Sequence, residues 1–258
     1  MNDFLIHTYQ PTLSTHSYLN EFNNKNYFDV NKFIAANDNE GLSYYFNSLY
    51  KSDNIFDTFF SLLYLRSLCV GSKLKLQLNK ETTLSINILN ILQRLIDNPQ
   101  QPLEDFTHKD LTIKFKLPSR LYNNNIITFL FDSINDLRID KNIENFKELN
   151  DKQKLLIIKN LKQEIILDIK NHIKERQTRY SIVQLDDITD FNNYKFSFYD
   201  NSAFFTLKFF FKNNISHLYN KLYHCIQKLN LPYSDYLGLT PSETNILLTI
   251  YKKSNNIK

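Results

Sequence analysis

Residues 53–87 change their hydrophobic period from that of a helix to that of a strand. In the first half, Phe and Leu recur close to every 3.6 residues, which predicts an apolar helix face between an Asp53 or Asn54 cap and Gly71. Beyond Gly71, apolar and polar residues alternate on both sides of a polar turn at 79–82, which predicts a β-hairpin with one buried face. The apolar positions are Phe56, Phe59, Phe60, Leu63 and Leu68 in the helix and Leu74, Leu76, Leu78, Leu84 and Ile86 in the hairpin.

The segments on either side of this stretch are also expected to form short elements. Residues 1–25 predict a short strand and an irregular arm, and residues 29–50 predict two short helices separated at 37–39, the first with Asp29 as its cap. Another helix is expected after the hairpin, up to Asp97. The alternating run 111–117 predicts a third strand, which we expect to join the hairpin because two strands alone are marginally stable in water.

The remainder of the chain predicts mainly helices. Pro118 and Ser119 end the third strand and open a helix that reaches Leu137. Asn150 and Gln153 form a capping-box pattern before a long helix. The other expected elements are that helix over 151–176, a hairpin of 181–185 with 194–199, a Phe-rich helix from Asn201 or Ser202 to about Leu229, a loop over 232–238, and a last helix opened by Thr240, Pro241 and Glu243.

Together these elements predict an α+β protein in which a small antiparallel sheet packs on helices and the C-terminal half is mainly helical. We expect an N-terminal α+β domain over residues 1–137, with the hairpin at its core, and a mainly helical region over 138–258. A chain of 258 residues buries roughly 70–75% of its unfolded surface when compact, so it needs no disulfide. Cys69 and Cys225 lie in apolar segments and are expected to be free core thiols.

Charge and hydropathy limit the classes of partner. The net charge is +4, from 31 basic and 27 acidic residues, and the most basic segment, 159–179, also carries Glu164, Asp168 and Glu175. This segment has two interpretations, a solvated helix face or a phosphate-binding ridge, and the second predicts DNA affinity that falls steeply with salt. Neither a signal peptide nor a membrane span is expected, because the opening MNDFLIHTYQ lacks an apolar core and no apolar run approaches about 18 residues.

Two groups of side chains could bind metal ions, but neither has the spacing of a known metal site. A structural zinc site usually brings four ligands at closer spacing, and a calcium loop needs ligands at alternate positions around a glycine. We therefore expect no metal and no other cofactor. The groups are His217 with His224 and Cys225, and Asp186 with Asp187 and Asp190.

Catalytic signatures are absent from the sequence, which contains no G-x-S-x-G, phosphate loop, dinucleotide glycine fingerprint or H-E-x-x-H. With only three glycines, the chain has few places where backbone could approach a phosphate closely. Cys69 lies at the end of a helix that does not lower a thiol pKa, and helix capping accounts for Glu243. We therefore expect no catalytic residues and no enzymatic activity.

Aromatic residues are the most unusual part of the composition, with 21 Phe and 16 Tyr. Exposed aromatic side chains are typical of protein interfaces, although core filling and a low-GC genome explain the surplus equally well. Arg66 within the apolar helix is a buried ion-pair partner, a recognition residue, or a stem packed on the core with its head in water. The tyrosines in segments that cannot all be buried are Tyr44, Tyr45, Tyr50, Tyr122, Tyr194, Tyr199, Tyr233 and Tyr236.

Four collinear motifs give the chain a resemblance to a known family. They are FFSLLYLRSLCVGSKLKLQL at 59–78, the strand that ends in Pro118 and Ser119, the segment 146–173, and LGLTPSETNILL at 237–248. In this order and spacing, over about residues 4–252, the sequence resembles the baseplate hub assembly family of T-even-like, contractile-tailed bacteriophages. Some members of that family carry Cys-x-x-Cys pairs between the strands, and this chain has none, so a metal-linked role does not follow.

The resemblance implies a non-enzymatic protein of phage tail morphogenesis that acts by protein–protein binding, either as a baseplate hub subunit or as a hub assembly chaperone. Its implied partners are other hub or tail proteins, with the tape-measure protein among the candidates. Its implied location is the host cytoplasm during assembly, with the virion tail baseplate as a second location. The alternative function is that of a nucleic-acid-binding accessory protein that uses the basic helix 159–179.

Overall fold

The structure is a computed structural model, and it describes residues 23–50, 54–77, 83–121, 125–139, 146–182, 195–211 and 214–255. The strand and arm expected over residues 1–25 lie outside this part of the chain except for the last three residues. The helices are α3 (Asn24–Ala35), α4 (Asn39–Tyr50), α5 (Ile55–Val70), α6 (Ile88–Asp97), α7 (Ile126–Ser133), α8 (Asp151–Lys159), α9 (Gln163–Arg176), α10 (Ser202–Phe211), α11 (Asn214–Leu229), α12 (Tyr233–Gly238) and α13 (Pro241–Ser254), with the 3-10 turn η1 (Phe146–Glu148).

The strands form three small antiparallel sheets within the described residues, so the expected α+β class with a mainly helical C-terminal half is confirmed. The hairpin expected after Gly71 is present, and its alternation has the expected result, because Leu74 pairs with Ile86 and both are buried. The strands are β1 (Lys73–Gln77) with β2 (Thr83–Asn87), β3 (Phe106–His108) with β4 (Leu111–Phe115) and β5 (Ile134–Ile139), and β6 (Tyr180–Ser181) with β7 (Lys195–Phe196).

Helix α5 is the centre of the larger hydrophobic core, where it contacts α4, α6, α10, α11 and α13. The Asn54 side chain accepts a hydrogen bond from the Asp57 N–H at 3.0 Å, and Gly71 follows the last residue with φ 98°, so the expected cap and stop are confirmed. The sequence predicted one apolar stripe, but α5 is buried on almost every side. A helix surrounded by neighbours has this character because no face remains for solvent.

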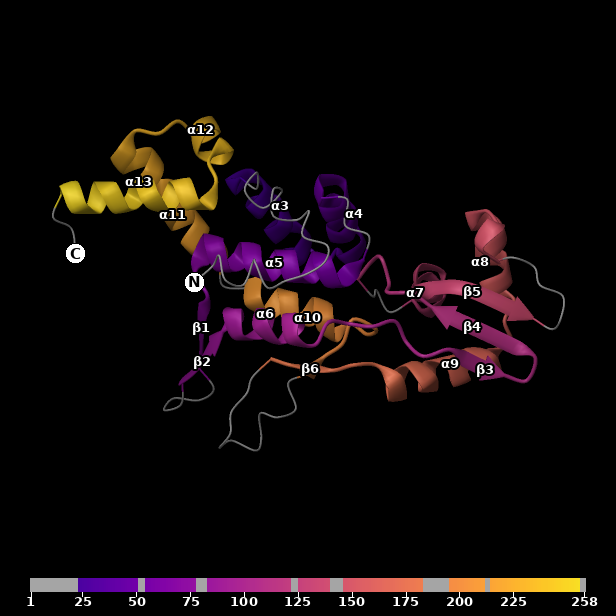
Figure 1. The fold of residues 1–258 in the computed structure, drawn as a ribbon. Coiled ribbons are helices and arrows are strands. Elements are labelled where there is room, and N and C mark those ends of the chain that lie inside the picture. The colour runs from indigo at the N-terminus through magenta and orange to yellow at the C-terminus, as the bar shows by residue number, and fades with distance from the viewer. Residues whose placement is uncertain are drawn as a thin grey trace.

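A second core lies between the β3–β4–β5 sheet and the helices α7, α8 and α9. Figure 1 shows this unit at one end of an elongated molecule and α11, α12 and α13 at the other. Strand β4 buries Leu111, Ile113 and Phe115 in this second core. The expectation that this strand would join the first hairpin is therefore wrong, because its partners are β3 and β5.

The helix expected to reach Leu137 is shorter than predicted, since α7 ends at Ser133 and β5 begins at Ile134. β5 pairs along β4, where Leu137 lies opposite Ile113. Both side chains are buried in the second core. Pairing with a distant strand thus outweighed the local helical pattern, which is the usual result when a tertiary contact opposes propensity.

Other boundaries also differ from the prediction. The first cap is Asn23, and Asp29 lies inside α3. The long helix expected over 151–176 is two helices, because Asn160 caps α8 and the chain turns so that Ile158 and Ile169 both reach the second core. The expected loop at 232–238 contains α12, and the Phe-rich helix is divided into α10 and α11.

The two cores do not follow the expected domain division. The position between residues 137 and 138 falls inside β5. The first core takes residues from 27–121 and again from 180–211, and the second takes residues from 103–173 together with Tyr199. The chain therefore leaves the first core, builds the second and returns. None of the helices in the described ranges is long and apolar enough to cross a membrane.

Candidate protein-binding surface

Three exposed tyrosines lie on the helices that follow the Phe-rich segment. Tyr219 and Tyr223 on α11 and Tyr233 on α12 each expose between 55% and 57% of their surface. The Tyr219 ring packs edge-on against Phe28 of α3, with ring centroids 5.6 Å apart. We call Phe28, Lys32, Tyr219, Tyr223 and Tyr233 the tyrosine patch.

Lys32 belongs to the same patch because it lies four residues after Phe28 on α3, so the two side chains share the helix face that Tyr219 contacts. Its ammonium lies 2.9 Å from Asp29 Oδ1 on the same helix, and this carboxylate is the main cause of a raised Lys32 pKa. The patch thus combines an exposed cation with aromatic rings that carry polar tips, as interface aromatics do.

The spacing of the tyrosines follows from the helix period. Tyr219 and Tyr223 are four residues apart, so they share one face of α11, while Cys225 is turned inward and fully buried. Helix α13 exposes a similar pair, Ile246 and Ile250, which are 57% and 58% exposed. The end of the molecule opposite the three-stranded sheet (Figure 1) is therefore rich in large exposed side chains.

Part-buried polar contacts between α11, α13 and the end of α5 hold these helices together. The Lys221 ammonium of α11 donates to the Cys69 carbonyl at the end of α5 and to Asn245 Oδ1 of α13 at 2.7 Å. The Asn245 amide in turn donates to the Leu68 carbonyl at 3.3 Å. Burial lowers the Lys221 pKa, and the cation lies where a helix end concentrates negative charge.

A second set of contacts joins α3 to α12 and α13. The Asn24 side-chain amide donates to the Tyr236 carbonyl at 2.9 Å and to Thr244 Oγ1 at 2.8 Å. The Asn24 backbone N–H donates to the Leu239 carbonyl at 2.9 Å. Asn24, Tyr236 and Thr244 are all buried. The helices that carry the tyrosine patch are therefore fixed relative to one another by hydrogen bonds as well as by packing.

Arg66 is buried and does not reach water, so the interpretation with its head in solvent is wrong. Its Nε donates to the Phe210 carbonyl at 3.3 Å, and its Nη1 donates to the Gly71 carbonyl. Burial lowers its pKa. No ion pair among the described residues includes Arg66. The packing of α10 on α5 supplies a backbone acceptor instead, which the sequence alone could not indicate.

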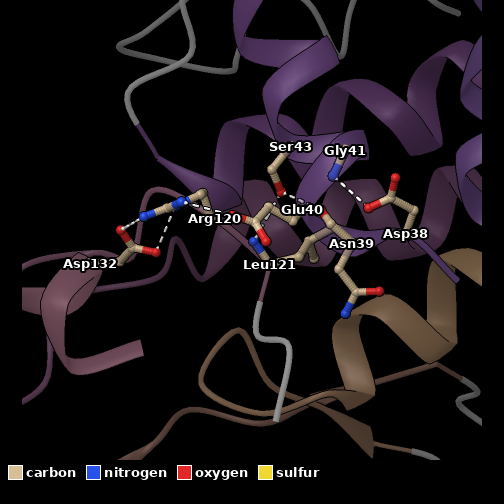
Figure 2. Close-up of polar contacts among 8 residues, drawn as sticks. All are labelled: Asp38, Asn39, Glu40, Gly41, Ser43, Arg120, Leu121 and Asp132. Atoms are coloured by element: carbon tan, nitrogen blue, oxygen red, sulfur yellow. Dashed lines mark hydrogen bonds and ion pairs between the residues drawn. The ribbon is translucent and has the colours of Figure 1, made fainter. Parts of the chain in front are cut away.

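Tyr44 and Tyr45 lie on α4 and take different roles. Tyr44 is 62% exposed, and the Arg120 guanidinium carbon lies 5.8 Å from its ring centre. Figure 2 shows that Arg120 also reaches Asp132, with which it forms two hydrogen bonds of 2.7 and 2.8 Å. The Tyr45 hydroxyl is part-buried, where it donates to Asp29 Oδ2 at 3.2 Å.

As expected, the named tyrosines are not all buried. Tyr233 is exposed like Tyr44, whereas Tyr199 and Tyr236 are buried. Tyr122, Tyr194 and the Tyr50 side chain lie outside the described residues. Sequence reasoning missed Tyr219 and Tyr223, although their spacing of four residues on an amphipathic helix was the available signal.

The described residues bear on only one of the two metal hypotheses, and only in part. His224 is exposed while Cys225 is buried, so the two neighbours face different environments. The His217 side chain and the Asp186, Asp187 and Asp190 group lie outside the described residues. Across the described ranges, no three His, Cys, Asp or Glu residues come together as a metal site would require.

The two cysteines and Glu243 match their expected roles. Cys69 and Cys225 are free and buried, as expected, and burial raises the pKa of both thiols. Glu243 completes the capping box with Thr240, whose N–H donates to Glu243 Oε2 at 2.8 Å and lowers its pKa.

The basic segment 159–179 is interrupted by acidic partners. On α9, Asp168 accepts from His108 at 2.9 Å, and Arg176 pairs with Glu104 at 2.7 Å. Glu164 and Glu175 add further negative charge to the helix. This mixture resembles a solvated, ion-paired face more than the uniform basic stripe that follows a phosphate backbone.

Comparison with known proteins yields no relative, because no protein family, curated protein or solved structure matches the chain. The chemistry of the tyrosine patch therefore indicates what the surface can bind. Its rings provide contact area, its hydroxyls and Lys32 provide polar contacts, and its supporting helices are held in place. These are the properties of a protein-binding surface.

Proposed function

We propose that this protein acts without catalysis, by binding other proteins during phage tail assembly, as a subunit or an assembly chaperone of the baseplate hub. The observation that carries the binding function is the tyrosine patch on α3, α11 and α12. The partner class comes from the resemblance of the four collinear motifs to the hub assembly family. The partners proposed on that basis are hub, tail or tape-measure proteins.

The physical support is that exposed tyrosine side chains on a rigid surface are well suited to binding a protein. Tyrosine is enriched among residues that dominate binding energy. It has only two side-chain torsions to immobilise, so it supplies contact area at a low entropic cost. In the tyrosine patch the rings already rest on helices joined by the contacts of Lys221 and Asn24, so little further ordering accompanies association.

The binding surface is tested by changing Tyr219 and Tyr223 together to Ala. A tagged form of the protein is recovered from infected cells, its bound tail proteins are identified, and the affinity for the purified partner is measured. We expect the Kd to rise at least about 30-fold, because loss of a central interface aromatic costs about 2 kcal/mol or more.

The matched control is Tyr44→Ala, because Tyr44 is as exposed as the patch tyrosines but lies on α4 beside Arg120. We expect this variant to bind with a Kd within about threefold of the wild type, since scattered exposed residues contribute little. If the patch variant retained wild-type affinity, or if no tail protein bound the intact chain, the proposed function would be refuted.

The two proposed roles differ in the composition of the finished particle. Mass spectrometry of purified virions finds several copies of a hub subunit, whereas a chaperone is recovered only with its partners from infected cells. Absence from both samples would remove the assembly role altogether.

A further inference from the structure

The outward face of α13 carries an apolar pair between two opposite charges. Ile246 and Ile250 are 57% and 58% exposed, although isoleucine is usually buried. Glu243 lies three residues before Ile246, Lys253 lies three residues after Ile250, and both are exposed. Because a helix turns by about 100° per residue, the four side chains fall within about 80° of one another. We call these four residues the α13 stripe.

The opposite face of α13 attaches the helix to the rest of the protein. Thr244 is buried and accepts a hydrogen bond from the Asn24 amide at 2.8 Å. Asn245 accepts from the Lys221 ammonium at 2.7 Å. These two residues directly follow Glu243 and lie about 100° and 200° from it around the helix. The α13 stripe is therefore turned away from α5 and α11, and no element of the described chain covers it.

The charges at the two ends of the α13 stripe are available to a partner. Glu243 caps the helix through Oε2, which accepts from the Thr240 N–H and hydroxyl at 2.8 and 2.9 Å. Its other carboxylate oxygen takes part in neither bond. Lys253 lies in the last turn of α13 and belongs to none of the ion pairs found among the described residues. A carboxylate oxygen and an ammonium thus flank the two isoleucines.

The α13 stripe has a spacing that is matched by its own reverse. Consider two antiparallel copies of α13 related by a two-fold axis at Leu248. Ile246 of one copy then faces Ile250 of the other, because each lies two residues from the axis. In the same register Glu243 faces Lys253, since each lies five residues from the axis. One symmetry operation therefore pairs apolar with apolar and negative with positive, as an interface between identical surfaces requires.

We propose that α13 pairs with α13 of a second copy of this chain, antiparallel and two-fold symmetric, to form a homodimer. Parallel pairing would place like charges opposite each other, which is unfavourable. Antiparallel pairing also sets the start of each helix beside the end of the other, where their dipoles attract. A partner of another sequence would give no reason for a stripe that matches its own reverse. The inference does not rest on the proposed function, because the α13 stripe and the tyrosine patch share no residue.

Sedimentation equilibrium of the full chain tests the dimer. The α13 stripe is only about 15 Å long, so the interface is smaller than a standard one and we expect a Kd of about 1–100 μM. Ile246→Gln combined with Ile250→Gln is expected to raise this Kd at least about tenfold. The matched control is Leu156→Gln combined with Leu167→Gln, which removes two similarly exposed side chains from α8 and α9. We expect its Kd to stay within about threefold of the wild type.

Disulfide cross-linking tests the register. Glu243→Cys and Lys253→Cys are prepared as separate variants, mixed, and treated with diamide, an azo oxidant that takes up the two hydrogens lost when two thiols form a disulfide. We expect the mixture to cross-link, because the two positions face each other. Each variant alone should cross-link at least about tenfold more slowly, since its two thiols lie about 15 Å apart along the helix axis. Cys69 and Cys225 are buried and do not compete.

Three results would overturn the proposal. They are a chain that stays monomeric at concentrations well above about 100 μM, equal dimerisation after the isoleucine substitutions, and cross-linking as fast within one variant as in the mixture. Tyr219→Ala combined with Tyr223→Ala is expected to dimerise as the wild type does, because neither residue lies on α13, and loss of the dimer in that variant would also contradict the α13 interface. A monomeric chain that loses its tail protein only when the isoleucines are replaced would assign the α13 stripe to a different partner.

The same variants separate this inference from the proposed function. A chain that dimerises through the α13 stripe but binds no tail protein would refute the proposed function and leave the dimer standing. A monomeric chain whose tail-protein affinity depends on the tyrosine patch would do the reverse.

Discussion

Replacing Arg120 by Met tests whether one buried ion pair holds α7 to the loop before it. Arg120 Nε and Nη2 donate to the two Asp132 oxygens at 2.8 and 2.7 Å. The Asp132 side chain is 8% exposed and that of Arg120 is 21% exposed. Methionine keeps most of the apolar stem but leaves the Asp132 carboxylate without this partner in a largely buried position.

The expected cost follows from that burial. Removing one member of a buried ion pair destabilises a protein by about 3–5 kcal/mol. Because Arg120 is one-fifth exposed and water can reach the vacated position, we expect the lower end, about 3 kcal/mol. This is a large share of the roughly 5–15 kcal/mol by which most domains are stable. Part of the loss is the contact with the Tyr44 ring, about 0.5–1 kcal/mol.

The assay is urea unfolding at neutral pH followed by far-UV circular dichroism, with the free energy of unfolding obtained by linear extrapolation. A loss of about 3 kcal/mol lowers the urea midpoint by roughly 1 M or more. The double variant Arg120→Met with Asp132→Leu removes the stranded charge, so we expect it to recover most of the loss.

The control pair is Arg138 and Asp136, because they form a single contact of 3.1 Å and the Arg138 side chain is 48% exposed. Arg138→Met is expected to cost less than about 1 kcal/mol, as exposed pairs do. The reasoning is refuted if Arg120→Met is no more destabilising than Arg138→Met, or if the double variant is no more stable than the single one.

Two further predictions concern helix ends. Gly71→Ala is expected to lower the free energy of unfolding by about 1–3 kcal/mol, because the backbone there has φ 98° and ψ 159°; the added carbon itself meets no atom within 4 Å. The control is Gly238→Ala, which has the same open space without a positive φ, so urea unfolding should show little loss of stability. Equal losses in the two variants would contradict the argument from backbone conformation. The pKa of Glu243 is lowered from 4.5 by its hydrogen bonds with Thr240, so its contribution to stability is present above the unfolded pKa and lost as pH falls through the folded pKa. Glu243→Gln retains the capping geometry and should therefore lose less thermal stability on acidification than the wild type; parallel melting profiles against pH would contradict this.

The local elements were predictable because their causes lie within a few residues of each other. The capping boxes of Asn150 and Thr240 formed as expected, since a cap and its partner are only three residues apart. The helix and hairpin around Gly71 were also predictable, because a change of period and one left-handed position are local properties.

Candidate sites were harder to predict than elements. Tyr44 and Tyr233 were named as surplus aromatics and are exposed, but Tyr236 was named with them and is fully buried. Tyr219 and Tyr223 were not named, although they form most of the tyrosine patch. Exposure depends on which face of α11 packs against α5, α12 and α13, and that choice is not encoded in the spacing of the tyrosines alone.

The sequence by itself determined the α+β fold class, the presence of most helices and the positions of several helix ends, because each follows from short-range periodicity and capping. Only the tertiary structure decided that β4 pairs with β3 and β5, that α5 is surrounded, and that Arg66 bonds a carbonyl of α10. These outcomes depend on contacts between residues far apart in the chain. Their free energies compete with local preference only after the chain has packed, which is why the tyrosine patch could be recognised only in the folded protein.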